Sequence, residues 1–350
     1  MELGTSIAQS FIKTAEIWRH CSISSRTSPA THMEPWTIGP WASHFCRWDG
    51  ITCTWTRRQW RVLSLTLTGK SLSGQISSSL GNLTFLNYLD LSQNNFFGPL
   101  PLLGGLQQLQ YLFLNNNNLS GNIPDALTNC SNLTYLDIST NSLVGSISPK
   151  FGLLSNLVSV SLADNQLNGS IPSELGQLRN LEYLILGGNR ISGQIPASIF
   201  SLSSLTSLSL DSNMLDKASL PPNIGELFPN LVQLTLENNS FEGPIPASLG
   251  NALGLEMIDL SLNNFSGKIP TSLGKLSNLT ILNLQHNQLV AKDNHDWEFL
   301  NALTVDLWIT SHSFTMSCRD LYRCQSATYR LAFNICCCLP TAYLDKFQGA

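Results

Sequence analysis

Leucine and other apolar residues recur from Val62 to Val290 with a period of about 24 residues. In the stretch Leu109–Pro124, apolar residues occupy places 1, 4, 6, 11 and 15, and mostly polar or small residues lie between them. The same frame opens ten times, and we number the turns 1 to 10 from Val62, Leu86, Leu109, Leu133, Leu157, Leu181, Leu205, Leu231, Leu255 and Leu279. A fixed period of this length predicts a solenoid with one turn of chain per repeat.

Places 4 and 6 alternate as residues on one face of a strand do, so each turn is expected to contain a short strand with both residues buried. Places 1 and 11 are expected to point inward from the flanking bends. Each buried apolar side chain contributes about 1.5–3 kcal/mol, whereas ordering the backbone costs about 1–2 kcal/mol per residue. One turn is therefore unstable by itself, and the turns must stack.

Place 9 is Asn in every turn except the first, which has Lys70. A buried amide there can bond backbone groups where the chain leaves the strand, and we expect a ladder of such amides: Asn94, Asn117, Asn141, Asn165, Asn189, Asn213, Asn239, Asn263 and Asn287. Glycine at place 13 of eight turns permits a sharp bend at positive φ, and proline often follows at place 16. Turn 7 departs from this pattern with Lys217 in place of glycine and a step of 26 residues.

The L-x-G-x-I-P half of each turn resembles the plant-specific class of leucine-rich repeat. From about residue 44 to 304, the chain is similar to the ectodomains of plant leucine-rich repeat receptor-like kinases, in particular the immune-receptor subfamily that includes the rice bacterial-blight resistance receptors. The resemblance implies an α/β repeat solenoid, a superhelix with a short parallel strand per turn on its concave face over residues 62–290. It also implies an extracellular or plasma-membrane-associated location.

The segment from His44 to Cys53, HFCRWDGITC, resembles the end of the N-terminal cap of these ectodomains, which we assign to residues 44–61. The resemblance implies a disulfide between Cys46 and Cys53 that pins the cap over the first turn; two thiols of a cytosolic chain are the alternative. Residues 1–43 lack the apolar run of a signal peptide. We interpret them as an irregular leader, either disordered or the product of a mis-assigned start.

The repeat pattern ends after turn 10. Residues 291–304 resemble the loop and helix that follow such a turn in the family, and residues 305–350 are interpreted as a non-repeat tail, as a frameshift or a retained intron would produce. Its apolar run LAFNICCCLPTAYL is shorter than the roughly 20 residues needed to span a bilayer, so we predict no membrane span.

The charge balance disfavours nucleic acid and anionic membranes as partners, because residues 62–290 contain 7 Lys and Arg against 13 Asp and Glu. The chain contains no G-x-S-x-G, H-R-D or D-F-G motif, so the family's kinase domain is missing and we expect no enzyme activity. Its six histidines are scattered, and its cysteines lack the paired spacing of a zinc site. We therefore predict no metal and no cofactor.

Every N-x-S/T triplet lies in the repeats, which is consistent with glycosylation of an extracellular surface. The alternative is that a repeat rich in Asn and Ser produces such triplets by chance. Two glycans at Asn129 and Asn132 would crowd each other, and we keep Asn132 of the pair. The predicted acceptors are Asn82, Asn118, Asn132, Asn168, Asn238, Asn264 and Asn278.

Places 2, 3, 5, 7 and 8 are expected to project from the concave face. Rows of aromatic residues with scattered carboxylates suit a peptide or protein ligand, because Tyr offers rigid area together with a hydroxyl. The alternative is that these residue types are merely common in this class of repeat. The candidate ligand-binding residues are Tyr88, Asp90, Tyr111, Phe113, Tyr135, Asp137, Tyr183 and Ile185, and the first-choice patch is Tyr88, Tyr111, Phe113 and Tyr135.

The function that we expect is recognition of a peptide or protein ligand, and of a co-receptor ectodomain, in defence or developmental signalling. A first alternative is a free-standing secreted binder, similar to the plant polygalacturonase inhibitors built on the same repeat. A second alternative is a truncated product without a function of its own.

Overall fold

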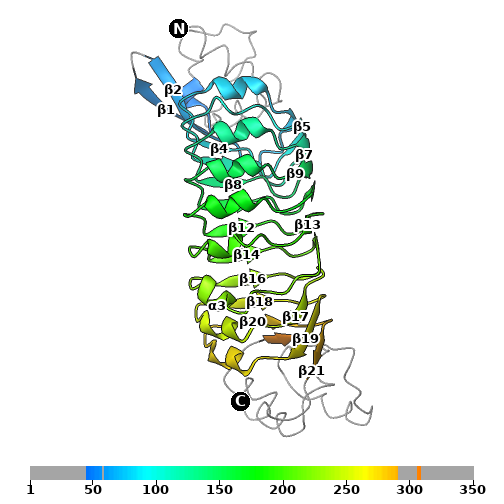
Figure 1. Ribbon diagram of the computed structural model, residues 1–350. Helices are drawn as coiled ribbons and strands as arrows, with labels where there is room; N and C mark the ends of the chain where they lie inside the picture. Colours follow the sequence, from blue (N-terminus) through cyan, green and yellow to red (C-terminus); the bar gives the residue numbers. More distant parts are fainter. Residues whose placement is uncertain (1–44, 57–58, 291–305, 309–350) are drawn as a thin grey trace, which may run out of the picture. The chain divides into compact units, whose positions relative to one another are not determined.

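The computed structural model describes residues 45–56, 59–290 and 306–308 (Figure 1). They belong to two compact units, residues 1–168 and 169–350. The leader predicted for residues 1–43, the loop and helix predicted for 291–304, and most of the predicted tail lie outside the described residues.

The main sheet of the first unit has the strand order β1-β2-β4-β6-β8-β10. It begins with an antiparallel hairpin of β1 (Ile51–Thr56) and β2 (Gln59–Thr66). Each following turn adds one parallel strand of three residues: β4 (Tyr88–Asp90), β6 (Tyr111–Phe113), β8 (Tyr135–Asp137) and β10 (Ser159–Ser161). Because the register pairs Tyr88 with Tyr111 and Tyr111 with Tyr135, equal places of successive turns lie side by side.

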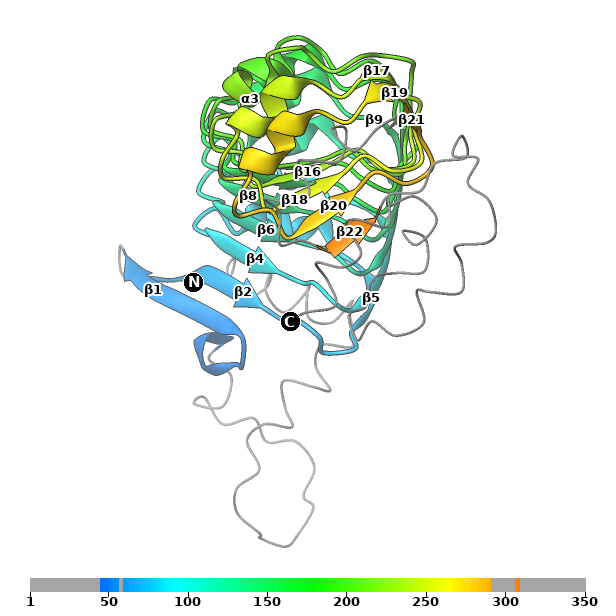
Figure 2. The same ribbon diagram turned by 90° about the horizontal axis from the view of Figure 1, so that it is seen from below.

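A second sheet runs along another side of the first unit, in the order β11-β9-β7-β5-β3. Its parallel strands are β3 (Ser73–Gln75), β5 (Asn95–Pro99), β7 (Asn118–Asn122), β9 (Ser142–Ser146) and β11 (Gln166–Asn168). The third side holds short 3₁₀-helices, η2 (Ser78–Asn82), η3 (Asp125–Asn129) and η4 (Pro149–Leu153), and the cap adds η1 (Phe45–Arg47). Figure 2 shows strands and helices on these different sides of a turn. The sequence did not predict the second sheet.

The second unit repeats this plan. Its main sheet has the order β12-β14-β16-β18-β20-β22, with β12 (Tyr183–Ile185), β14 (Ser207–Ser209), β16 (Gln233–Thr235), β18 (Met257–Asp259), β20 (Ile281–Asn283) and β22 (Asp306–Trp308). Another side carries β13 (Ser192–Gly193) with β15 (Met214–Leu215), and separately β17 (Glu242–Pro244), β19 (Asn264–Lys268) and β21 (Gln288–Val290). The helices are η5 (Ser173–Gln177), η6 (Ile199–Ser201), α3 (Ile224–Leu227), η7 (Ala247–Asn251) and η8 (Thr271–Lys275).

Leucines fill the interior of each unit. In turn 3, Leu109, Leu112, Leu114 and Leu119 are all buried, as the frame predicts for places 1, 4, 6 and 11. Larger rings fill wider spaces at Phe96 and Phe151 in the first unit and at Phe228, Phe241 and Phe265 in the second. The predicted fold class, a leucine-rich repeat with stacked parallel strands, is confirmed.

Helical structure in the described residues is mostly of the 3₁₀ type, and α3 is the sole α-helix among them. In turn 3, the Leu127 N–H donates to the Pro124 carbonyl at 3.0 Å, and the Cys130 N–H donates to the Leu127 carbonyl at 3.1 Å. Pro124 itself is extended, with ψ of 133°. The helical segment itself is five residues long, a length at which i→i+3 bonded 3₁₀-turns are common and a regular α-helix is not favoured.

The chain leaves the main sheet through a left-handed residue at place 8. Asn116, Thr140 and Leu262 have φ of 55°, 52° and 53°, and glycines occupy the same place in turns 1 and 6. The sequence did not predict this conformation. The glycines at place 13, by contrast, have the positive φ expected for them, for example 77° at Gly121.

Two features of the second unit differ from the sequence pattern. Turn 7 is two residues longer than its neighbours, and the second sheet is interrupted after β15 in this turn. In addition, β22 pairs in parallel with β20, with Leu282 beside Leu307. The boundary that the sequence suggested at residue 305 stays a prediction, because the residues around this pairing lie outside the described ranges. A short parallel pairing uses backbone groups, so it does not require the leucine frame to continue.

Candidate functional site

The solvent side of each main sheet, here called the sheet face, is formed by places 3 and 5 of the turns. In the first unit it carries the aromatic patch of Tyr88, Tyr111, Phe113 and Tyr135. These side chains alternate with the buried Leu89, Leu112 and Leu136 along β4, β6 and β8. The strand period of two therefore sends the rings outward as it sends the leucines inward.

The four rings of the aromatic patch contact one another across the three strands. Tyr111 and Tyr135 are stacked, with ring centroids 5.2 Å apart and planes inclined by 7°. Tyr88 lies 5.4 Å from Tyr111 and 5.8 Å from Phe113 between centroids. Such contacts hold each ring in place and leave its outer surface half exposed.

Two carboxylates flank Phe113 in the row of place 5. Asp90 on β4 and Asp137 on β8 are the register partners of Phe113 on β6. Oδ1 of Asp90 accepts hydrogen bonds from the Ser92 N–H at 3.0 Å and the Ser92 hydroxyl at 2.6 Å. Ser139 makes the same two bonds to Asp137, at 3.0 and 2.6 Å. The serine two residues after each aspartate thus fixes the direction of the carboxylate.

The surroundings of Tyr88 affect the ionisation of its hydroxyl. Its pKa is raised, first because the ring is partly buried, and then because the Asp90 carboxylate and Tyr111 disfavour the phenolate. Tyr88 therefore stays neutral at physiological pH and presents a hydroxyl that can both donate and accept a hydrogen bond.

The sheet face of the second unit has a different character. Tyr183 and Ile185 lie on β12, and Tyr183 is 39% exposed, with no aromatic partner at the same place in the next turn. The structure thus brings together the six candidates of the first unit in one patch, and these two residues form a separate position in the second unit.

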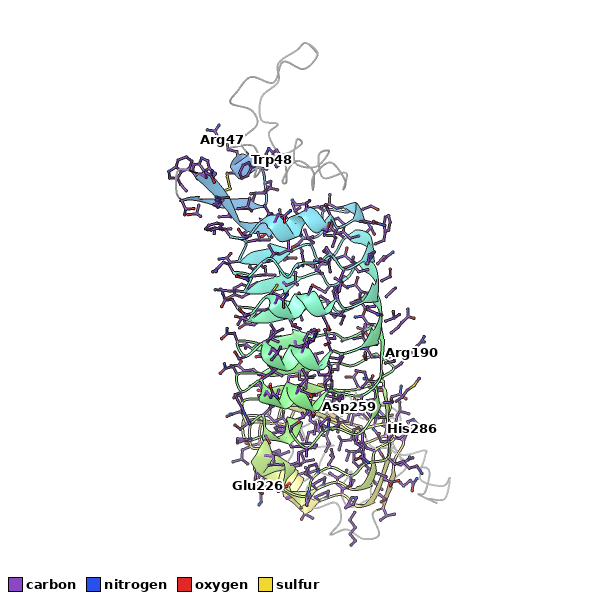
Figure 3. All side chains as sticks on the ribbon, turned by 45° about the horizontal axis from the view of Figure 1, so that its top comes forward. Arg47, Trp48, Arg190, Glu226, Asp259 and His286 are labelled. Carbon is purple, nitrogen blue, oxygen red and sulfur yellow. A yellow bond between two sulfur atoms is a disulfide. The ribbon has the colours of Figure 1, made fainter. Side chains whose placement is uncertain are left out.

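The second unit also contains a group of acidic residues, in which Asp211 and Glu237 follow β14 and β16 and the buried Asp259 ends β18; Asp259 is labelled in Figure 3. The pKa of Glu237 is raised by partial burial and by the nearby charges of Asp259 and Asp211. Asp211 accepts from the Ser209 hydroxyl at 2.6 Å, and it occupies space that Gly187 leaves open by having no side chain. Our sequence analysis missed this group, although a count of acidic residues at places 5 and 7 would have found it.

The amides at place 9 bridge successive turns. Oδ1 of Asn141 accepts from the Leu119 N–H at 2.9 Å, and its Nδ2 donates to the Leu114 carbonyl at 3.1 Å. In the second unit, Asn263 is bonded in the same way to the Phe241 N–H and the Leu236 carbonyl. Each amide therefore satisfies backbone groups of the preceding turn that the two sheets leave unpaired.

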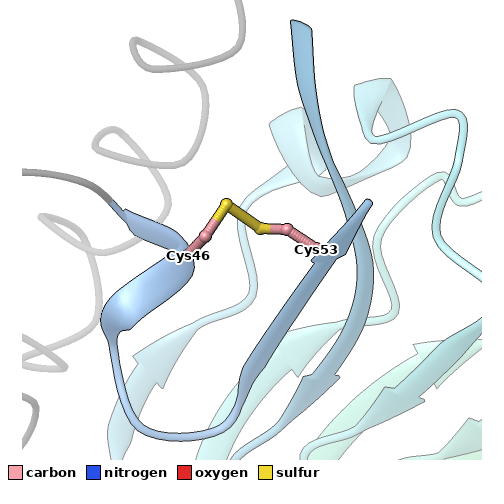
Figure 4. The surroundings of a disulfide bond; sticks show 2 residues. All are labelled: Cys46 and Cys53. Atoms are coloured by element: carbon pink, nitrogen blue, oxygen red, sulfur yellow. A yellow bond between two sulfur atoms is a disulfide. The ribbon is translucent and has the colours of Figure 1, made fainter. Parts of the chain in front are cut away.

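The cap of the first unit contains a disulfide between Cys46 and Cys53, which joins η1 to β1 (Figure 4). The hairpin that follows carries the exposed pair Trp55 and Trp60, whose ring centroids are 5.2 Å apart. Cys130 is a buried thiol that donates to the Leu103 carbonyl, and burial raises its pKa to about 11. It is thus a small core residue rather than a reactive group.

The predicted glycan acceptors differ in their surroundings. Asn132 and Asn264 are half-buried, and the Asn132 side chain donates to the Gln107 carbonyl at 2.8 Å. The remaining acceptors are exposed: Asn82, Asn118, Asn168, Asn238 and Asn278. Glycosylation at all seven stays a prediction.

Within the described ranges, no cluster of His, Cys, Asp or Glu is arranged to hold a metal ion. None of the helices in those ranges has the length and apolar character needed to cross a membrane.

Comparison with known families identifies the repeats. The family model described as "Leucine Rich repeats (2 copies)" matches residues 107–151, and the one described as "Leucine rich repeat" matches residues 155–215 and 229–289. Among curated relatives, the LRR receptor-like serine/threonine-protein kinase EFR of Arabidopsis thaliana is 50% identical over 60 residues, which are 17% of this chain and 6% of that protein.

Two solved ectodomains are similar over most of this chain. One is that of the Arabidopsis thaliana receptor kinase GASSHO1/SCHENGEN3, in complex with CASPARIAN STRIP INTEGRITY FACTOR 2, with 40% identity, a TM-score of 0.72, and 77% and 32% of the two chains covered. The other is the Arabidopsis receptor kinase HAESA, in complex with the peptide hormone IDA and the co-receptor SERK1, with 30% identity, a TM-score of 0.64, and 83% and 50% covered. The chain thus spans at most half of these ectodomains, and the match to the kinase EFR covers a small fraction of that protein. The predicted resemblance to plant leucine-rich repeat receptor-like kinases is confirmed.

Proposed function

We propose that this chain, whose leucine-rich repeats resemble those of plant receptor ectodomains, is the recognition region of a receptor-like kinase and binds a peptide or protein through the sheet face of its first unit. The observation that carries the proposal is the aromatic patch. Its four rings contact one another on the solvent side of β4, β6 and β8.

The patch is suited to binding because it is rigid before the ligand arrives. Stacking between Tyr111 and Tyr135, and the contacts of Tyr88 with Tyr111 and Phe113, restrict the rings, so a ligand loses less free energy to ordering them. Tyrosine combines an apolar ring with a hydroxyl and is enriched among the residues that dominate binding energy. The buried leucines already stack the turns, so the rings are available for a partner.

The similar ectodomains support a peptide as the ligand. One of them is named in a complex with a peptide hormone and a co-receptor, and we propose the same kinds of partner for this chain. We also propose that the chain acts outside the cell, in defence or developmental signalling, and that it acts by binding rather than by catalysis. The chain spans 32% and 50% of the two solved chains. We therefore propose the kinase and the membrane anchor of such receptors for a longer protein of which this chain is the recognition region.

Panning of a phage-displayed library of random dodecapeptides against the full 350-residue chain, secreted from insect cells, tests this function. We expect enriched peptides whose affinity falls about 10-fold or more for Tyr111→Ala, about 1.4 kcal/mol of binding energy. The control is Phe97→Ala, which removes an exposed ring of the second sheet in the same unit. The proposal is wrong if panning enriches no binder, or if the binders respond to Phe97→Ala and not to Tyr111→Ala.

A further inference from the structure

Asp90, Phe113 and Asp137 form one row across three neighbouring strands. The register of β4, β6 and β8 pairs Phe113 with both aspartates. Neighbouring strands lie about 4.8 Å apart, so the two carboxylates are separated by roughly 10 Å with the ring between them. A flat cation on the ring would therefore lie within reach of a carboxylate on each side.

Both carboxylates are held ready for a ligand. Ser92 and Ser139 each donate two hydrogen bonds to Oδ1 of the aspartate that precedes them. In the described part of the chain, the hydrogen bonds to these two carboxylates use Oδ1, so Oδ2 keeps its capacity to accept. An aspartate whose direction is already fixed binds a donor without a further loss of side-chain entropy.

The charge of the surrounding repeats favours a cation. Residues 71–168 contain four acidic residues, Asp90, Asp125, Asp137 and Asp164, and one basic residue, Lys150. Lys150 forms an ion pair with Asp125 at 2.7 Å on the helical side of the unit. Lys70 of turn 1 is paired with Asp49. The ion pairs of these two lysines thus do not include Asp90 or Asp137, whose field attracts a positively charged partner.

The aromatic component selects among cations. A guanidinium is planar, stacks on an aromatic ring, and donates hydrogen bonds in its own plane, whereas an ammonium is a compact, strongly hydrated charge. Among the described residues of the first unit, the guanidinium carbon of Arg61 makes such a contact, 5.1 Å from the centroid of the Phe85 ring.

We infer that the row Asp90–Phe113–Asp137 binds the side chain of an arginine in an extended peptide ligand. The guanidinium stacks on Phe113 and donates to a carboxylate on either side, and neighbouring ligand residues lie along Tyr88, Tyr111 and Tyr135. This inference rests on the proposed peptide-binding function and names the residue type that the ligand must present.

The same panned peptides provide the test. We expect arginine to be enriched in the binders, and replacement of that arginine by citrulline, which keeps the shape and removes the charge, to weaken binding about 10-fold. Raising the salt concentration should weaken the arginine peptide more than the citrulline peptide.

The protein variant Asp90→Asn/Asp137→Asn removes both charges while each Asn keeps an oxygen for the serine donors. We expect it to bind the arginine peptide about as weakly as the wild type binds the citrulline peptide, and to show no further loss with citrulline. The matched control is Asp125→Asn, which removes an acid of the same unit on the helical side. If the double variant fails to fold, the affinity of the citrulline peptide for the wild-type protein, compared with that of the arginine peptide, still tests the inference.

The outcomes separate this inference from the proposed function. Binders that depend on Tyr111 but tolerate citrulline would overturn the inference and leave peptide binding intact. A lysine peptide that binds as tightly as the arginine peptide would overturn it too, because planar stacking would then contribute nothing. Binders that ignore both Tyr111 and the aspartates would overturn the function and the inference together.

Discussion

Oδ1 of Asn117 accepts a hydrogen bond from the backbone N–H of Phe96, 3.0 Å away in the preceding turn. Nδ2 of the same amide donates to the Leu91 carbonyl of that turn at 3.0 Å and to the Leu114 carbonyl of its own turn at 3.1 Å. One buried side chain thereby joins two turns and binds a backbone N–H of β5 and two carbonyls that follow the main-sheet strands.

We predict that Asn117→Ala lowers the free energy of unfolding of the first unit by about 1–3 kcal/mol, because the buried Phe96 N–H loses its acceptor. The Leu91 and Leu114 carbonyls each keep a second amide donor, from Asn94 and Asn141. Urea unfolding of unglycosylated protein, followed by hydrogen exchange in β4 to β7, measures the change. Asn118→Ala, at the exposed neighbouring position, is the control and should shift stability by less than about 0.5 kcal/mol. Equal effects of the two substitutions would contradict a structural role for the amide.

Replacement of the cap disulfide by Cys46→Ser/Cys53→Ser should destabilise the cap locally. The two cysteines are separated by 7 residues, and closing so short a loop is worth about 2–3 kcal/mol in the chain-entropy description. Hydrogen exchange should become faster in β1 and β2, while β8 and β10 stay protected, because each turn contacts mainly its neighbours. Cys130→Ala is the control for loss of a cysteine and should leave exchange in β1 and β2 unchanged.

Leu262 is left-handed, with φ of 53°, although its side chain is 42% exposed. A left-handed conformation costs a residue with a Cβ about 1–2 kcal/mol relative to glycine. We therefore expect Leu262→Gly to stabilise the second unit by about 1 kcal/mol, measured as a rise in the urea midpoint. Leu253→Gly removes a leucine that is 58% exposed and has no positive φ, and it should not stabilise. A loss of stability in both variants would show that strain at place 8 is negligible.

Cys130 should resist alkylation in the folded protein. Burial raises the pKa of its thiol to about 11 from an ordinary value of 9.0, and the thiolate is the reactive form. At pH 8 its thiolate fraction is lower by roughly 100-fold, and the fraction should grow about tenfold per pH unit until the pH approaches the pKa. Labelling with iodoacetamide, read out by peptide mapping, measures the rate at Cys130 itself. Rapid labelling before unfolding in concentrated urea would contradict burial of this thiol.

The periodic part of the structure was open to prediction from the sequence. Leu109, Leu112 and Leu114 are buried, and Tyr88, Tyr111 and Tyr135 lie in a row, because a strict repeat sets equal places side by side in every turn. The period also places an amide at place 9 of the later turns, such as Asn117, where we expected it to bond backbone groups as the chain leaves the strand.

The second sheet could not be predicted in this way. Its strands, for example Asn118–Asn122, contain a glycine of positive φ and show no clean alternation of apolar and polar residues. The sequence pattern of a strand is therefore absent from them. The acidic group of Asp211, Glu237 and Asp259 was missed for a related reason, since its members are divided between places 7 and 5 of three successive turns.

The sequence by itself determined the period, the buried leucines and the positions of the outward-facing side chains, because these follow from local alternation repeated along the chain. Only the tertiary structure decided the stacking of Tyr111 on Tyr135, the direction of the Asp90 carboxylate and the left-handed exit at Asn116. The stacking depends on the distance between neighbouring turns, whereas the other two features depend on hydrogen bonds and a φ angle within one turn, which the leucine period does not specify. The distance between turns is set when the turns pack together, and no single turn encodes it.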